Sequence, residues 1–196
     1  MKKGTIILIA VVVVIFLMIS NAIGKYNTMV TMDEGVDAAW SQVENVYQRR
    51  ADLIPNLVST VKGYAEHEKE TFTAVTEARS KVNNINLEGI VNNPAAMKNF
   101  QASQGQLSGA LSKLMVVMER YPELKANQGF LDLQTQLEGT ENRIAVERGR
   151  FNKAAQAFNT IIRRFPGSIY AGMFGFEKKA YFEAEAGAEK APKVEF

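Results

Sequence analysis

The first two dozen residues are the most apolar part of the chain. Ile6 to Ile19 form an unbroken apolar run, and no charged residue stands between Thr5 and Ser20. With Ala22 and Ile23 the stretch reaches about 20 residues, the length of a helix that crosses a bilayer. We therefore predict a membrane anchor at residues 1–24. The residues expected to form its apolar surface include Ile6, Leu8, Val12, Ile15, Phe16 and Ile19.

Beyond Tyr26, apolar residues recur at alternating steps of three and four. This mean spacing of 3.5 keeps one stripe of a helix facing a partner and favours left-handed knobs-into-holes packing. The first seam is Val36, Trp40, Val43, Tyr47, Arg50, Ile54, Leu57, Val61 and Tyr64. The second is Met97, Phe100, Gln104, Leu107, Leu111, Leu114, Met118 and Tyr121. The third is Phe130, Leu133, Leu137, Thr140, Ile144, Glu147, Phe151, Ala154, Phe158, Ile161 and Phe165. Three seams in one chain predict a helical bundle.

Cap and turn residues divide the seams into separate helices. Asn93 followed by Pro94 is typical of a helix start, because the asparagine side chain caps free N–H groups and proline has none to satisfy. Pro122 and the Phe165-Pro166-Gly167 run predict the ends of the second and third helices. Pro55 falls inside the first seam, so we expect a kink there that leaves the Ala51 carbonyl without its helical partner.

The predicted fold class is all-α. A single N-terminal transmembrane helix precedes a long antiparallel, coiled-coil-like bundle of three to four helices at residues 25–165. A segment rich in glycine and aromatic residues, with a tail, follows at 166–196. The first helix of the bundle is expected to run from about Lys25 to Val82, roughly 85 Å at 1.5 Å per residue.

Helix lengths predict an uncovered stretch near the membrane. If the chain turns after Val82, the second helix reaches back only to about Arg50, and Lys25 to Arg49 becomes a stalk. An apolar stripe of this size calls for a partner. Either the C-terminal segment folds back over it, or neighbouring copies pair along it, which predicts a homo-oligomer. The stripe consists of Val36, Trp40, Val43 and Tyr47.

The segment after the third helix has an unusual composition. Aromatic and apolar residues crowd around Gly167, Gly172 and Gly175. These residues either cap the bundle in a fold-back segment or form a contact surface for another copy, a partner or a bilayer. The residues assigned to that surface are Tyr170, Phe174 and Phe176. The tail from Glu183 to Phe196 is expected to be frayed or paired to a neighbour.

Charge is balanced outside the anchor. The net charge is +2, and Lys2 and Lys3 account for it, which leaves equal numbers of basic and acidic residues from Lys25 onward. A neutral body disfavours nucleic-acid binding, which depends on clustered basic side chains. Lys2, Lys3 and the amino terminus outweigh Lys25, so the positive-inside rule places the N-terminus in the cytoplasm and the body outside. Ser20-Asn21-Ala22 leaves a cleaved signal peptide as the alternative to an anchor.

The sequence resembles the LemA family. The run YNTMVTMDEGVDAAWSQVENVYQRRADLIPNLVSTVKGYAEHE, from Tyr26 to Glu68, is similar to the first hallmark block of that family. GFLDLQTQLEGTENRIAVERGRFNKAAQAFN, from Gly129 to Asn159, is similar to the second block, and RRFPGSIYAGMFGF is similar to the third. The resemblance implies an antiparallel four-helix bundle on one membrane helix in the bacterial envelope. Its fourth helix could come from the break at Pro55 or from the segment after Pro166.

Three seam positions are polar where an apolar residue is expected: Arg50, Gln104 and Glu147. Such residues are costly unless paired, and they commonly fix helix register or oligomeric state. On the register above, Arg50 lies far from Glu147, and Glu119 or Glu123 is its expected partner. A partner-docking role for this polar layer is the alternative.

Catalytic chemistry has few residues to build on. His67 is the single histidine and there is no cysteine, so thiolate sites and disulfides are excluded and a histidine-based triad or metal site is disfavoured. Glu66 and Glu70, which flank His67, are expected to form a solvated face. The resemblance supplies no catalytic residue either. We expect no catalytic, cofactor or metal site and no small-molecule substrate.

The predicted function is that of a non-enzymatic, single-pass membrane protein of the bacterial envelope that self-associates as a scaffold or docks a membrane or envelope partner. The alternative is a membrane-anchored adaptor or receptor that signals to or regulates an envelope protease or another membrane protein. LemA proteins often occur beside membrane metalloproteases, which is the source of that alternative.

Overall fold

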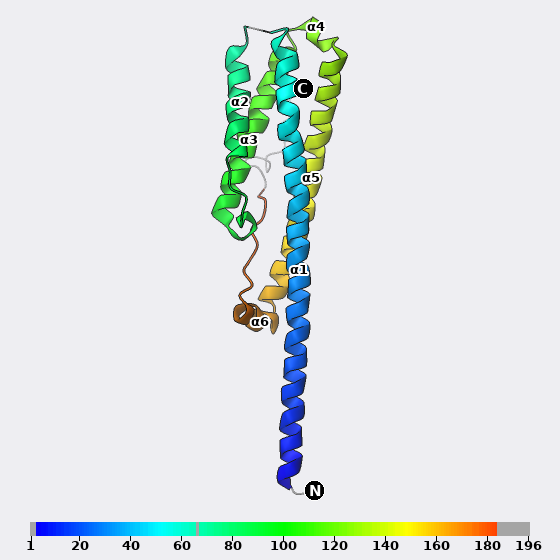
Figure 1. The fold of residues 1–196 in the computed structure, drawn as a ribbon, viewed down its shortest axis with the longest axis vertical. Coiled ribbons are helices and arrows are strands. Elements are labelled where there is room, and N and C mark those ends of the chain that lie inside the picture. Colours follow the sequence, from blue (N-terminus) through cyan, green and yellow to red (C-terminus); the bar gives the residue numbers. More distant parts are fainter. Residues whose placement is uncertain (1–2, 66, 184–196) are drawn as a thin grey trace, which may run out of the picture.

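The structure is a computed structural model that describes residues 3–65 and 67–183. Its described residues form helices and no strands, which confirms the all-α fold class. The longest element is α1 (Lys3–Lys62), which at 60 residues is about 90 Å long. The predicted anchor and the first bundle helix are therefore one continuous helix, and its N-terminal end projects from the bundle (Figure 1).

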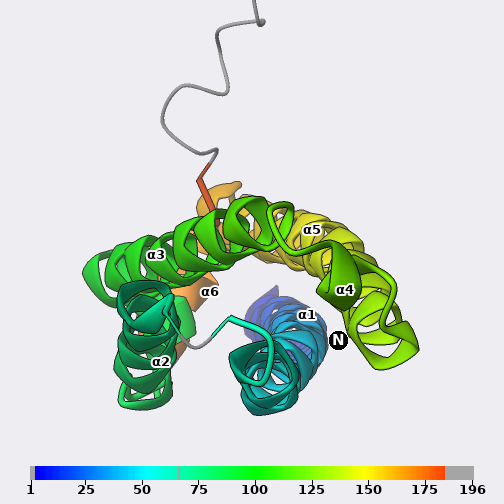
Figure 2. The same ribbon diagram turned by 90° about the horizontal axis from the view of Figure 1, so that it is seen from above.

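The bundle has four long helices in up-down-up-down order. After α1 come α2 (Lys69–Asn83), the short 3₁₀ helix η1 (Ile90–Asn92), α3 (Pro94–Met118), α4 (Pro122–Lys125) and α5 (Gln128–Arg163). Seen end-on, α2, α3 and α5 form an arc beside α1 (Figure 2). α5 packs mainly against α1 and α3 mainly against α2, so the bundle consists of two helix pairs. The short helix α6 (Gly167–Phe174) lies at the end nearest the anchor (Figure 1).

The fourth helix of the bundle is α2, and its origin corrects the sequence prediction. The expected helix from Lys25 to Val82 is broken between Lys62 and Lys69, and the chain reverses there. Neither Pro55 nor the segment after Pro166 supplies the fourth long helix. The chain turns back about twenty residues earlier than predicted, so α3 reaches the level of Trp40 and not merely that of Arg50. Phe100 of α3 lies 5.7 Å from the Trp40 ring, centroid to centroid.

The seams are largely the buried stripes. In α1 every seam residue through Val61 is buried, and Tyr64, beyond the helix end, is exposed. In α3 the whole seam from Met97 to Met118 is buried. In α5 the stripe shifts by one residue after Phe151, so Ala155 and Ile162 are buried in place of the predicted Ala154 and Ile161. A shift of this kind follows from the mismatch between 3.6 residues per turn and a 3.5-residue repeat.

Helix ends and the proline position follow local chemistry. The side chain of Asn93 caps α3 as predicted, accepting hydrogen bonds from Ala95 N and Ala96 N at 3.1 Å. Helix α1 continues through Pro55. The Ala51 carbonyl, which loses its helical donor to that proline, accepts a hydrogen bond from Arg79 Nε of α2 at 2.8 Å. Arg79 therefore satisfies the one backbone group that the proline leaves free.

Candidate docking groove and buried arginine layer

Arg50 lies at the centre of the bundle and is 2 % exposed. Its guanidinium donates from Nη1 to Ser108 Oγ at 2.9 Å and to Glu141 Oε2 at 2.7 Å, and from Nη2 to Gln104 Oε1. The group also lies over the Tyr47 ring, 5.1 Å from its centroid. A buried arginine is tolerated in this arrangement because charge, hydrogen bonds and an aromatic face compensate for its lost hydration.

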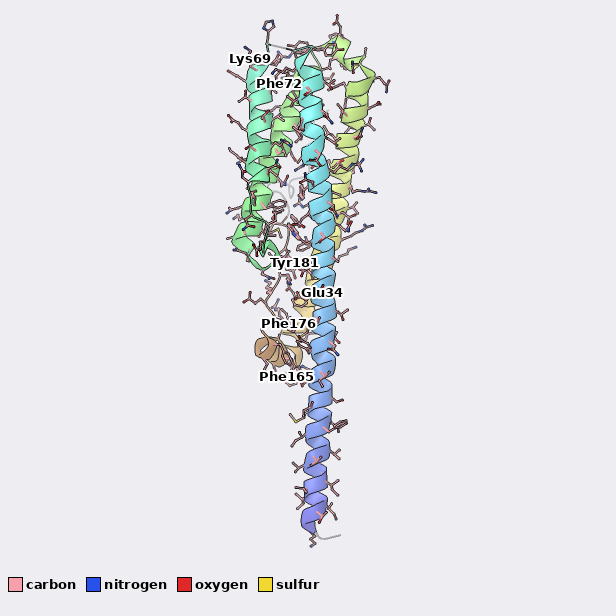
Figure 3. All side chains as sticks on the ribbon, viewed as in Figure 1. Glu34, Lys69, Phe72, Phe165, Phe176 and Tyr181 are labelled. Atoms are coloured by element: carbon pink, nitrogen blue, oxygen red, sulfur yellow. The ribbon has the colours of Figure 1, made fainter. Side chains whose placement is uncertain are left out.

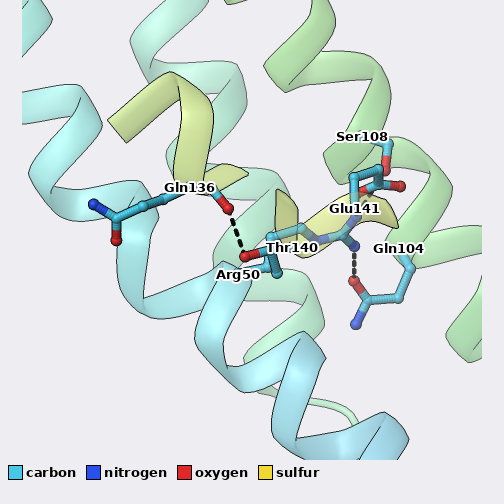
Figure 4. Close-up of polar contacts among 6 residues, drawn as sticks. All are labelled: Arg50, Gln104, Ser108, Gln136, Thr140 and Glu141. Atoms are coloured by element: carbon cyan, nitrogen blue, oxygen red, sulfur yellow. Dashed lines mark hydrogen bonds and ion pairs between the residues drawn. The ribbon is translucent and has the colours of Figure 1, made fainter. Parts of the chain in front are cut away.

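The arginine layer separates two apolar cores. One core, nearer the anchor, includes Tyr47, Phe100 and Ile144; the other begins at Ile54 and Leu107 on the far side. Arg50 of α1, Gln104 of α3 and Glu141 of α5 meet between them, whereas Thr140 of α5 donates to the Gln136 carbonyl of its own helix at 2.7 Å (Figure 4). Because only one register pairs these polar groups, the layer fixes how the helices align.

The partners of the polar seam residues differ from the prediction. Arg50 and Gln104 do meet, but the acid that pairs with Arg50 is Glu141, not Glu119 or Glu123. Glu119 pairs with Lys125 at 2.6 Å. The wrong partner follows from the missed reversal after Lys62, because the additional turn makes α3 parallel and α5 antiparallel to α1, the opposite of the predicted directions. Glu147 pairs with Arg150 on its own helix at 2.8 Å and so stands apart from the arginine layer.

Arg50 forms part of the floor of a groove between α3 and α5. The groove has a volume of about 380 Å³. Its walls carry the apolar side chains of Leu111, Met115 and Leu137, and polar groups complete its lining. The polar lining consists of Ser108, Ser112, Gln134, Glu138 and Glu141. Arg50 Nε is buried and has no hydrogen-bond partner among the described residues. The groove therefore combines apolar walls, a cationic floor and exposed acidic residues, and we call it the α3–α5 groove.

Comparison with known sequences identifies the family to which this helical bundle belongs. The sequence model of the LemA family matches residues 39–196. The chain belongs to the LemA family. The match confirms the resemblance read from the three sequence blocks. In the structure the first two LemA blocks form most of the α1–α5 pair, and the third forms α6 and its flanks.

Named relatives of this LemA chain come from several bacteria. Magnetosome proteins MamQ 1 and MamQ 2 of Paramagnetospirillum magneticum (strain ATCC 700264 / AMB-1) are each 29% identical over 182 residues, covering 84% of this chain and 67% of theirs. Magnetosome protein MamQ of Magnetospirillum gryphiswaldense is 28% identical over 201 residues, covering 93% of this chain and 74% of its own. Protein LemA of Metamycoplasma hominis is 25% identical over 162 residues, covering 83% and 70%. None of these names is an enzyme name.

The stalk stripe is buried inside this LemA chain, which corrects its assignment as an open surface. Val36, Trp40, Val43 and Tyr47 all belong to the membrane-proximal core. Helix α5 covers the stripe from one side; Phe151 packs edge-on to Trp40 at 5.6 Å between ring centroids. The C-terminal segment covers it from another, with Phe182 stacked on Trp40 at 5.9 Å. Of the two predicted ways to cover the stripe, the fold-back of the C-terminal segment holds.

The covering segment, residues 176–183, runs from α6 back along the bundle, and we call it the strap. Side-chain amides of α5 bind both the backbone N–H and the backbone C=O of two strap residues. Asn159 donates to the Lys179 carbonyl at 2.9 Å and accepts from Lys179 N at 2.8 Å. Asn152 does the same for Phe182, at 2.9 Å in both bonds. Because Asn152 and Asn159 are two helical turns apart on one face of α5, they hold an extended segment alongside the helix, running in the opposite chain direction.

Further contacts fix the middle of the strap and its C-terminal end. Lys179 is buried, pairs with Asp33 of α1 at 2.5 Å, and lies over the Phe158 ring. Ala180 N donates to the Val91 carbonyl at 2.7 Å. Glu183 is held by Gln101 and Arg148. The remainder of the predicted frayed tail, residues 184–196, lies outside the described residues.

The other predicted surface residues gather beside α1 near the anchor. Phe174 packs edge-on to Tyr26, with ring centroids 4.9 Å apart, and Phe176 lies 5.9 Å from the same ring. Tyr170 stacks with Phe174 at 6.5 Å. Phe174 remains exposed, whereas Tyr170 and Phe176 are half-buried. These residues thus hold α6 against α1, and only part of their area stays open.

Sequence reasoning missed the residues that bind backbone. Arg79, Asn152 and Asn159 lie off the seams, and polar side chains that bind a distant main chain show no sequence periodicity. The free Ala51 carbonyl was the one available signal, since it required a donor. His67 is exposed, and no group of three residues able to hold a metal ion occurs within residues 3–65 and 67–183.

Proposed function

We propose that this LemA protein is a non-enzymatic docking module of the bacterial envelope, held on the membrane by the N-terminal part of α1. Support for the anchor comes from α1 itself. It is the one helix within the described residues that is long and apolar enough to cross a bilayer, and its apolar window is fully exposed. Exposed aliphatic side chains over that length are stable in lipid and not in water.

The α3–α5 groove is the observation that carries the docking role. Met115 is half-buried at the groove, above the buried side chains of Leu111 and Leu137, and helical grooves of this kind accept the apolar face of an amphipathic helix. Glu138 and Glu141 are exposed at the groove, so basic residues beside that apolar face would be favoured. The proposed occupant is therefore an amphipathic helix with basic flanks, belonging to a membrane or envelope protein.

The chemistry of the groove suits binding better than catalysis. Its cation, Arg50, is held by three side chains from two helices, and its carboxylates are exposed. The single histidine, His67, lies at the far end of the bundle, in the turn between α1 and α2, and does not line the groove. Nothing in this set pairs a nucleophile with a base, which nucleophilic catalysis requires.

In-cell photocrosslinking tests the groove. A photoreactive residue in place of Ser112 or Gln134, both in the groove lining, should form an adduct with one defined protein. The same residue in place of Val146, which is exposed on α5 outside the groove lining, is the matched control. Adducts from the groove positions alone support docking there. Equal adducts from Val146, or none from either groove position, contradict the proposal.

Self-association is the second form that docking can take. The reason first given for it, an uncovered stalk stripe, is removed by the fold, so the α3–α5 groove is now the surface that a second copy could occupy. If it does, the groove crosslinks will join two copies of this chain, and light scattering of the detergent-solubilised protein will give more than one copy per particle. A monomer in both measurements would contradict self-association and leave a different protein as the occupant.

The bundle is proposed to face the outside of the cytoplasmic membrane, because Lys2 and Lys3 outweigh Lys25 across the span. A C-terminal alkaline phosphatase fusion should then be active, and a fusion to a reporter that works only in the cytoplasm should be inactive. The reverse pattern would place the body inside.

A further inference from the structure

The position of the bilayer surface along α1 can be located from its charges. Lys3 and Lys25 bracket the apolar span, and the 22 intervening steps correspond to about 33 Å of helix. The hydrocarbon core of a bilayer is about 30 Å thick. The outer boundary of the membrane therefore falls close to Asn21–Lys25.

Helix α6 is attached to α1 at that same level. The Tyr170 hydroxyl donates a hydrogen bond to Asn21 Oδ1 at 3.3 Å, and Phe174 packs against Tyr26. Gly167 at the start of α6 allows the close approach to α5, because a Cβ there would lie 2.2 Å from the Ile161 carbonyl oxygen. At the other end, Gly175 adopts a left-handed backbone with φ of 77° and turns the chain into the strap.

One face of α6, together with Phe165 just before the helix, is apolar and uncovered. Phe165, Ile169 and Met173 are 82 %, 52 % and 70 % exposed. Ile169 and Met173 are four residues apart in α6 and therefore share one side of that helix, and Phe165 lies in the turn that leads into it. Figure 3 shows Phe165 on the side of α6 that faces the anchor end, whereas Phe176 lies on the side toward the bundle. Elsewhere in the described part of the bundle, exposed large apolar residues such as Val116 and Val146 stand singly.

The charges and tyrosines around this face are those of a membrane interface. Arg163, Arg164 and Lys178 are exposed on either side of α6, against one exposed acid, Glu177. Tyr26 and Tyr170 lie at the same level. Tyrosines at the boundary and basic residues beside an apolar helix face are typical of segments that lie in the headgroup layer of a bilayer.

We propose that α6 is a second membrane contact: it lies in the interfacial layer of the bilayer that α1 crosses, with Phe165, Ile169 and Met173 in contact with lipid. The transmembrane helix alone would let the bundle tilt and rotate. A second contact, joined to α1 through Tyr170 and Phe174, holds the bundle at a fixed height and orientation. This contact is independent of what occupies the α3–α5 groove.

The absence of cysteine allows a direct test on the full chain. Ile169→Cys and Met173→Cys variants, each carrying a polarity-sensitive fluorophore, are reconstituted in lipid vesicles that contain spin-labelled lipids with the quencher near the headgroup. The matched controls are Val146→Cys, with the same exposed fraction of 52 % as Ile169, and Val116→Cys, with the same 70 % as Met173. Circular dichroism and the emission of buried Trp40 confirm that each labelled protein is folded.

The proposal predicts several-fold stronger quenching by the spin-labelled lipid at positions 169 and 173 than at 146 and 116, and weaker quenching there by iodide in the water. Equal iodide access at all four positions would overturn it. A label at 169 or 173 that is shielded from both quenchers would also overturn it, because that result indicates a protein contact.

Discussion

Two arginines satisfy groups that the helices leave without partners. Arg79 donates to the Ala51 carbonyl, which Pro55 deprives of its helical donor, and Arg50 binds Gln104 and Ser108 of α3 and Glu141 of α5. Both side chains reach across from one helix to another, so each ties a local irregularity in sequence to the packing of the bundle. The loss of unfolding free energy on removing either arginine should therefore depend on the acceptor group that is left without a donor.

The first prediction concerns the buried Gln104 oxygen, which has no donor when Arg50 is replaced. Arg50→Met should destabilise the protein by about 1–3 kcal/mol, because the buried oxygen of Gln104 loses its donor. Glu141→Gln should cost less than about 1 kcal/mol, since Glu141 is exposed and its ion pair is screened by water. Chemical unfolding in detergent, followed by circular dichroism, measures both. Arg50→Met with Gln104→Leu should recover much of the loss; a double variant as unstable as the single one would contradict this account.

The Arg79 prediction is a double-mutant cycle with Pro55. Arg79→Met should cost about 1 kcal/mol, the net value of one hydrogen bond to a backbone group. In a Pro55→Ala background, residue 55 gains an N–H that can donate to Ala51, so the same change at Arg79 should cost clearly less. Unfolding free energies of the four proteins give the coupling. Equal costs in the two backgrounds would show that Arg79 does not compensate for the proline.

At the scale of elements, the helices were predictable and their connections were not. Seam residues from Val36 to Val61 and from Met97 to Met118 are buried as predicted, because apolar periodicity is a local property. The reversal after Lys62 was missed because good helix formers follow Gly63 and the seam continues through Tyr64. The strap was missed because Asn152 and Asn159 recognise backbone, which carries no sequence signature. Arg50 and Gln104 were identified as polar positions, but the acid that pairs with Arg50 could not be predicted without knowing that the chain reverses between α1 and α2.

The strap should be released by loss of one amide. Asn159→Leu leaves the buried N–H and C=O of Lys179 without partners, at about 1–3 kcal/mol each. Hydrogen–deuterium exchange of the Lys179 and Ala180 amides should therefore accelerate by an order of magnitude or more. Gln156→Leu, on the exposed side of the same helix, is the control and should leave their exchange unchanged. Unaltered protection in Asn159→Leu would mean that packing of Phe182 alone retains the strap.

The far end of the bundle should respond to alkaline pH. The Tyr121 hydroxyl donates to Glu68 at 3.1 Å and thereby links the α3–α4 turn to the start of α2. Its pKa is raised by partial burial, then by the hydrogen bond to Glu68 and that group's charge, while Arg120 acts to lower it. With a raised folded-state pKa, the stabilisation is complete below the ordinary tyrosine pKa of about 10 and is lost as pH rises through the higher value. The late part of an absorbance titration should lose the contribution of one tyrosine in Tyr121→Phe; identical curves would refute this.

At the scale of the whole molecule, the proposed membrane contacts and the proposed docking groove lie on different parts of the fold. The anchor part of α1 and helix α6 lie at one end of the molecule (Figure 1), and the α3–α5 groove extends from Arg50 toward the other end. The strap and α5 cover the apolar stripe that was first assigned to a partner, which consists of Val36, Trp40, Val43 and Tyr47. Among the described residues, the α3–α5 groove is the surface proposed for a protein partner, so the proposed docking role depends on access to it.

Reversible blocking of the groove tests this role most directly. In a Met115→Cys variant, the single thiol in the groove wall is capped with a bulky methanethiosulfonate reagent. The partner that groove crosslinking identified is then quantified, without crosslinking, in the protein purified from membranes. The account predicts that the cap abolishes retention, that a reductant which removes the cap restores it, and that the same cap on Val146→Cys has no effect. Full retention by the capped Met115→Cys protein would contradict the groove as the docking site.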